Sequence, residues 1–157
     1  MDETGRPFDY AAAAGNAILL GIGIWGYLTL PGTIPTHFGL DGRAATWGPS
    51  WTILMLPLVS TFGAAAVWFF NKIGLRARLP FYVPDDRRDA VNAIARQMNS
   101  ALLLVLAAFF IVMELEIIGA ARDSATSLLI LPTVAALLIC VLTLLGAYMT
   151  KMYRAAR

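Results

Sequence analysis

Four long apolar runs, separated by short polar segments, dominate the pattern of hydrophobic and polar positions along the chain. A helix needs about 20 mostly apolar residues to cross a hydrocarbon core of about 30 Å. Lipid offers the backbone no hydrogen-bond partner, so each run predicts a membrane-spanning helix. The predicted spans are Ala11–Leu30, Trp51–Asn71, Asn99–Ala121 and Ser127–Thr150. The expected fold is therefore all-α, one four-helix transmembrane bundle over residues 1–157.

The connections between the runs predict an ordered loop and a helical extension. The first connection contains Pro31, Pro35, Gly39 and Gly42, which stiffen the chain and permit tight turns, so we expect an ordered loop between the first two helices. In the second connection, Pro84 is followed by two aspartates, a pattern typical of a helix start. We expect a helix that begins there and continues into the third span.

Composition and charge support a membrane protein and indicate its orientation. Hydrophobic residues make up 59% of the chain and charged residues 14%, against about 45–50% and about 25% in a soluble domain. The net charge of +2 is too small to suggest a nucleic-acid surface. Of the 12 Lys and Arg residues, all but Arg43 and Arg122 lie in the two tails and the middle connection. The positive-inside rule places those segments in the cytoplasm and the first and third connections outside.

Two acids interrupt the third span near its predicted outer end. Glu114 and Glu116 are costly in a bilayer, and such residues are by default candidates for function. Residues two apart point to nearly opposite faces of a helix, so the two acids are not expected to form a carboxylate pair. We expect one to face the bundle and the other to reach an interface or a partner. The alternative is a structural hydrogen bond to a neighbouring helix or loop.

The single histidine lies on the same side of the membrane as these acids. His37 could contact Glu114 or Glu116, and His37 with either acid and Asp41 could supply ligands to a metal ion, although no ligand-spacing motif is present. A structural hydrogen bond between His37 and a carboxylate is the favoured alternative. No cofactor is expected apart from this metal ion. No nucleophile accompanies a base, so we expect a protein that is not an enzyme.

Polar and small residues inside the first span predict contacts between helices. Ala13, Ala17 and Gly21 recur every four residues, and such stripes let helix backbones approach closely in lipid. Asn16 is expected to form a hydrogen bond to another helix or to lipid headgroups.

The first connection carries the one recognisable motif. Leu30-Pro31, Ile34-Pro35-Thr36-His37-Phe38-Gly39, Gly42, Trp47-Gly48 and then Leu56-Pro57 follow one another over about 30 residues. This pattern resembles a bacterial membrane domain of unknown function, the N-terminal domain of SdpI-type toxin-immunity proteins, which also occurs alone in small multi-span proteins. An aspartate before the Trp-Gly pair and a lysine after it are part of the usual pattern and are replaced here.

The resemblance implies a multi-pass protein of the bacterial inner membrane, and the distribution of Lys and Arg predicts that both termini are cytoplasmic. We expect an accessory subunit of a membrane complex or an SdpI-like immunity or sensing factor, with other membrane subunits as partners. The motif residues expected to serve a partner are Pro35, His37, Phe38, Gly42, Trp47 and Gly48. The alternative is a protein that binds or transports a small molecule or metal ion through His37 with Glu114 or Glu116.

Overall fold

A computed structural model describes residues 6–72, 79–124 and 129–157 of the chain. Its four long helices are α1 (Arg6–Thr29), α2 (Met55–Lys72), α3 (Arg88–Gly119) and α4 (Ile130–Ala156). Each is long and apolar enough to cross a membrane. The expected all-α four-helix membrane bundle is therefore confirmed. The predicted start of the fourth span at Ser127 lies outside the described residues, as do Arg76 and Arg78 of the middle connection.

The connection between α1 and α2 is a two-stranded antiparallel hairpin, which the sequence pattern did not predict. Strands β1 (Thr33–Phe38) and β2 (Ala44–Pro49) pair and lead through the 3-10 turn η1 (Ser50–Leu54) into α2. Both strands are edge strands, where proline is tolerated. The pairing register shifts on either side of His37, and such irregularities increase the local twist of a hairpin.

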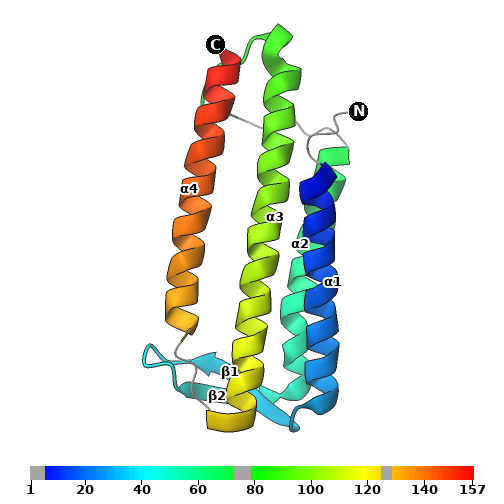
Figure 1. The fold of residues 1–157 in the computed structure, drawn as a ribbon, viewed down its shortest axis with the longest axis vertical. Coiled ribbons are helices and arrows are strands. Elements are labelled where there is room, and N and C mark those ends of the chain that lie inside the picture. The colour runs from blue at the N-terminus through cyan, green and yellow to red at the C-terminus, as the bar shows by residue number, and fades with distance from the viewer. Residues whose placement is uncertain (1–5, 73–78, 125–128) are drawn as a thin grey trace.

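The hairpin lies across one end of the bundle, and α1 starts and α4 finishes at the opposite end (Figure 1). We call these the hairpin end and the basic end. The basic end carries most of the described Lys and Arg side chains: Arg87, Arg88, Arg96, Lys151, Arg154 and Arg157. The hairpin end carries Arg43 and Arg122.

Helix α3 is the central element of the bundle. It packs against α1 and α2 on one side and against α4 on the other (Figure 1). Its 32 residues, preceded by the 3-10 turn η2 (Asp85–Arg87), span about 48 Å at about 1.5 Å per residue, more than a hydrocarbon core. This confirms the expected helical extension beyond the third span.

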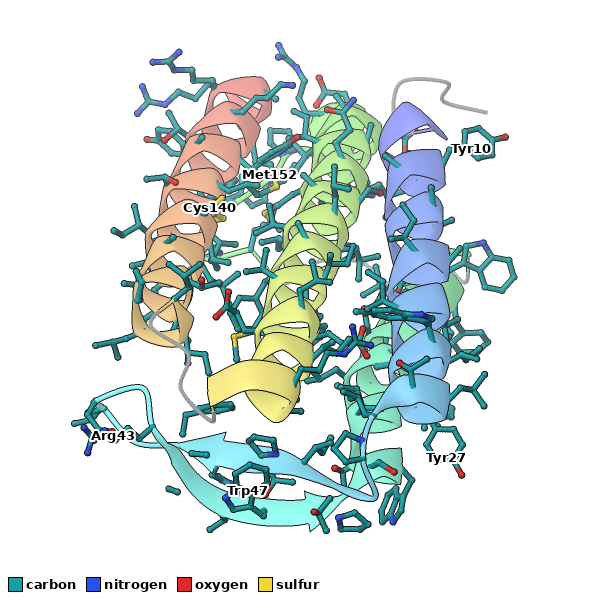
Figure 2. All side chains as sticks on the ribbon, turned by 60° about the horizontal axis from the view of Figure 1, so that its bottom comes forward. Tyr10, Tyr27, Arg43, Trp47, Cys140 and Met152 are labelled. Carbon is teal, nitrogen blue, oxygen red and sulfur yellow. The ribbon has the colours of Figure 1, made fainter. Side chains whose placement is uncertain are left out.

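Helix α4 is held chiefly at the basic end. Met152 and Ala156 are buried there against Val91 and Ala95 of α3, and Figure 2 shows Met152 between the two helices. No other described residue of α4 is fully buried. The enclosed interior at the hairpin end is therefore built by α1, α2 and α3.

Helix α1 faces that interior with a heptad-like stripe of buried residues. Ala12, Asn16, Leu19, Gly23 and Gly26 alternate at spacings of four and three and are all buried, the pattern expected for closely packed helices. Tyr10 and Tyr27 point away from the bundle (Figure 2). The polar Asn16 and the two glycines of this stripe are the positions that shape the interior.

Candidate functional site

The motif residues of the first connection all lie on or between the hairpin strands. Pro35 is buried and pairs with the exposed Trp47, while Phe38 is half-buried and pairs with Ala44. Gly48 pairs with Ile34 and passes close to Thr36, whose Cγ2 would lie 2.8 Å from a Cβ at Gly48. The connection between α1 and α2 is therefore ordered, as predicted, and its buried residues fix it to the bundle.

The turn of the hairpin depends on a glycine in the left-handed region. Gly42 has a φ of 74°, which a residue with a Cβ adopts only with strain. The backbone N–H of Gly39 donates to the carbonyl of Arg43 at 2.8 Å, and the Asp41 carboxylate accepts from the N–H of Arg43 at 3.1 Å. The expectation that glycine permits a tight turn here is confirmed at Gly42.

His37 lies exposed on β1 and bonds across the hairpin. Its Nδ1 lies 3.0 Å from Oγ1 of Thr46 on β2. The same Thr46 hydroxyl lies 3.1 Å from that of Thr36. The hydrogen bond expected between His37 and a carboxylate is wrong for Glu114, because neither Glu114 oxygen has a partner among the described residues. The hairpin satisfies this imidazole locally, without reaching into the bundle.

Glu114 faces the interior of the three helices, as expected for one of the two acids. Its side chain is 0% exposed, and both Oε1 and Oε2 are without a hydrogen-bond partner in the described chain. Glu114 therefore does not make, with any described residue, the structural hydrogen bond considered as an alternative. Buried polar groups are nearly always paired, so this unpaired carboxyl is the most unusual feature of the fold.

The space occupied by Glu114 exists because position 23 is glycine. A Cβ placed on Gly23 would lie 2.8 Å from Oε1 of Glu114, 3.0 Å from Cγ of Pro57 and 3.6 Å from Cδ2 of Leu54. Three elements, α1, α2 and η1, therefore meet at this position. Besides the acid oxygen, the atoms nearest to it belong to the apolar side chains of Pro57 and Leu54.

An apolar cluster separates Glu114 from the hairpin. Ile118, one helical turn further along α3, packs with Ile34 of β1 and Ile53 of η1, and the three are between 1% and 4% exposed. We call these three residues the isoleucine plug. Gly26 of α1 lies beside it, since a Cβ there would be 3.2 Å from Cδ1 of Ile118. The plug closes the interior at the hairpin end, so it lies between the hairpin and the acid.

The three predicted metal ligands are not gathered into one site. His37 is exposed and bonded to Thr46, Glu114 is buried against Gly23, and Glu116 is half-buried. No group of three or more His, Cys, Asp and Glu side chains that could hold a metal ion occurs among the residues that the structure describes. Metal binding through these residues stays a prediction.

Asn16 makes the inter-helical contact expected of it. The hydroxyl of Ser60 on α2 donates to Oδ1 of Asn16 at 2.7 Å, and Nδ2 of Asn16 donates to the carbonyl of Ala12 at 3.0 Å. Asn16 precedes Gly23 by seven residues on the same stripe of α1. The interior thus contains a satisfied polar pair about 10 Å along the helix axis from the unsatisfied acid.

Arg122 has a structural role that the sequence pattern did not indicate. It lies in the π-helical turn η3 (Ala120–Ser124), with its guanidinium 4.5 Å from the ring centroid of Trp25. Its Nη2 donates to Oγ1 of Thr29 at 2.9 Å. A cation is favoured at the C-terminal end of a helix, and Thr29 is the last residue of α1. Arg122 therefore ties the end of α3 to the end of α1.

The predicted packing stripe on α1 does not pack within this chain. Ala13, Ala17 and Gly21 are exposed, and no atom beyond the helix itself lies within 4 Å of a Cβ on Gly21. The prediction is wrong for the chain's own helices, because the buried stripe of α1 is rotated away from these positions. An almost uniformly apolar helix gives no amphipathic signal from which the packed face could be chosen.

Comparison with known proteins gives one match, to part of the chain. A family model described as a domain of unknown function, DUF1648, matches residues 15–61, a little less than a third of the chain. No curated protein and no solved structure matches the chain. The matched segment runs from α1 through the hairpin into α2, so it includes Gly23 and Pro57 but not Glu114. It supports the resemblance to a domain of unknown function, and no more specific activity.

Proposed function

We propose that this multi-pass membrane protein is not an enzyme, and that it acts through its hairpin as an accessory subunit of a membrane complex or as an SdpI-like immunity or sensing factor. The observation that carries the proposal is the hairpin, which is anchored on the bundle and also exposes side chains to its surroundings. Ile34 and Pro35 are buried and hold it on the bundle. His37, Leu40 and Trp47 are exposed, with Leu40 88% exposed.

The order of the hairpin supports a binding role. Its turn is fixed by Gly42, and the N–H of Ser50 donates to the carbonyl of Gly32 at 3.0 Å where the hairpin leaves the bundle. A preorganised surface loses less conformational entropy on binding than a flexible loop does. The exposed Trp47 side chain supplies the kind of aromatic area that partners commonly bury.

The placement that we propose is the bacterial inner membrane, with the basic end in the cytoplasm. The two ends of the bundle differ in basic residues, and such residues are retained on the cytoplasmic side. Both termini would then be cytoplasmic, and the hairpin would face outward. In this placement the hairpin meets partners that are extracytoplasmic or that belong to neighbouring membrane subunits.

Replacement of His37 tests the hairpin as the partner surface. We expect a partner chain to co-purify with the wild-type protein when it is isolated in gentle detergent from the cells that naturally produce it. His37→Ala, isolated in the same way, should no longer bind that partner chain. Tyr82→Ala is the matched control, because Tyr82 is 82% exposed and lies close in sequence to residues of the basic end. It should retain that chain. Equal recovery of the partner with both variants would contradict the proposal.

A further inference from the structure

The unpaired carboxyl of Glu114 has no role in the hairpin surface proposed above. Water is scarce at this depth of a membrane protein, so an acid whose two oxygens lack partners within the described chain is costly. Both polar side-chain atoms of Asn16, in the same interior, have a hydrogen-bond partner. The bundle can therefore pair a buried polar group, yet no described residue pairs with Glu114.

The charged groups around Glu114 leave it without a counter-ion. The sequence has no Asp, Glu, Lys, Arg or His between Tyr10 and Thr29, between Trp51 and Asn71, or between Leu129 and Thr150. These ranges cover the parts of α1, α2 and α4 that lie at this level. On α3 itself, Glu116 points to nearly the opposite face.

The charged groups of the hairpin end are engaged elsewhere. His37 bonds to Thr46, and Arg122 bonds to Thr29 and stacks on Trp25. Arg43 lies 3.9 Å from Asp41 in the hairpin turn. No cation is therefore placed against the Glu114 carboxyl by any of the described residues.

The lining of the site favours the smallest occupant. An ionised carboxylate without a counter-ion is the most costly state in an apolar site. A metal ion would remove that cost only with about four to eight ligands. Pro57 and Leu54, whose side chains lie nearest to Gly23 besides the acid, offer no ligand atom, and the described residues include no group of three or more His, Cys, Asp and Glu that could hold a metal ion. A proton needs no further ligand and no additional volume.

We propose that Glu114 is a proton-binding site inside the membrane bundle, closed toward the hairpin by the isoleucine plug. Its protonated carboxyl occupies the space beside Gly23 while the plug is closed. A carboxylate formed by loss of the proton requires water, and Ile118, Ile34 and Ile53 pack together between the acid and the hairpin. Proton release is therefore linked to displacement of the hairpin from the end of the bundle.

Infrared spectroscopy of the full chain in phosphatidylcholine vesicles tests the proton directly. A protonated carboxylic acid has a carbonyl stretching band that is separate from the carboxylate bands and shifts in D₂O. We expect this band at neutral pH in the wild-type protein and in Glu116→Gln, and its loss in Glu114→Gln. Carboxylate bands in the wild-type minus Glu114→Gln difference would overturn the proposal. So would loss of the acid band on adding sodium or zinc chloride at constant pH.

A second variant assigns the band without altering Glu114. The sequence contains three glutamates, Glu3, Glu114 and Glu116. In Glu3→Gln/Glu116→Gln made by cell-free synthesis with ¹³C-glutamate, Glu114 is the one labelled side chain. The acid band should then shift to the frequency of the ¹³C carbonyl. A shift confined to carboxylate bands would contradict the proposal even if Glu114→Gln failed to fold.

Exchange of the acid proton in D₂O tests the plug. We expect Ile118→Val and Ile118→Ala to exchange several-fold faster than the wild-type protein, because each opens space between Glu114 and the hairpin. Leu142→Ala is the control, since Leu142 is 67% exposed on α4, and it should leave the rate unchanged. Identical rates in all four proteins would overturn the link between the proton and the plug.

Discussion

Two buried polar sites share the interior of α1, α2 and α3, and they differ in how they are satisfied. The Asn16 side chain accepts from Ser60 and donates to Ala12. The Glu114 side chain is more deeply buried and has no partner among the described residues. Asn16 belongs to the buried stripe of α1, and Glu114 lies against Gly23 of the same stripe. The difference therefore lies in what surrounds each group and not in the bundle as a whole.

This difference separates a polar group that holds helices together from one that is available for function. A hydrogen bond between helices replaces contacts that lipid cannot supply, so Asn16 and Ser60 stabilise the association of α1 with α2. An unpaired acid weakens the fold and is retained for another reason. The proton-binding site proposed for Glu114 supplies such a reason.

The largest effect is expected from cavities beside each site. Leu19, 0% exposed, lies between Asn16 and Gly23 on α1, and Leu19→Ala should lower the free energy of unfolding by about 2–5 kcal/mol. Ile118→Ala removes a similar volume but admits water to Glu114. It should therefore lower the free energy of unfolding by clearly less than Leu19→Ala does. Thermal unfolding in detergent measures both. An equal or larger loss for Ile118→Ala would show that hydration does not relieve the acid.

A smaller effect is expected from side chains added to two glycines of α1. Gly23→Val places a methyl-bearing carbon where Oε1 of Glu114 is 2.8 Å away, so it should destabilise the protein by about 1–3 kcal/mol. A Cβ at Gly21 has no described atom outside its own helix within 4 Å, so Gly21→Val should change stability by less than about 0.5 kcal/mol. Combining Gly23→Val with Glu114→Ala should recover part of the loss. Unfolding curves of the four proteins decide this, and equal effects at both glycines would refute the packing of Glu114 on α1.

The smallest effect is expected in the hairpin. Thr46→Val removes the hydroxyl that bonds to His37, but both side chains are exposed, so the change should cost no more than about 0.5–1 kcal/mol. The histidine ring signals in NMR spectra should shift, while the Glu114 acid band should not. A change in that band would show that His37 and the acid are coupled, contrary to the separation provided by the plug.

The sequence predicts the parts of this structure that follow from apolar length and from helical spacing. The four helices, the extension before the third span and the inward orientation of one of the two acids were expected and are present, and Asn16 forms the inter-helical bond that was one of its two expected alternatives. Each depends on a local rule, such as the 20-residue span or the opposite faces of positions two apart.

The parts that were missed depend on tertiary contacts. The prolines at positions 35 and 49 conceal β1 and β2, because proline normally argues against a strand. The packed face of α1 could not be chosen, since apolar residues surround the whole helix. The surroundings of Glu114 depend on how Gly23, Pro57 and Leu54 come together in the fold. These residues are distant from the acid in sequence, so its lack of a described partner could not be predicted.

One comparison of two variants tests most directly whether Glu114 is unpaired while Asn16 is paired. Ser60→Ala leaves Oδ1 of Asn16 without its donor and should lower the free energy of unfolding by about 0.5–2 kcal/mol. Glu114→Met keeps a similar volume but removes the unsatisfied oxygens, so it should raise the free energy of unfolding by about 1–3 kcal/mol. Opposite signs in parallel unfolding measurements are the predicted result. Destabilisation by both variants to a similar extent would contradict it, because Glu114 would then have a partner that the folded protein loses.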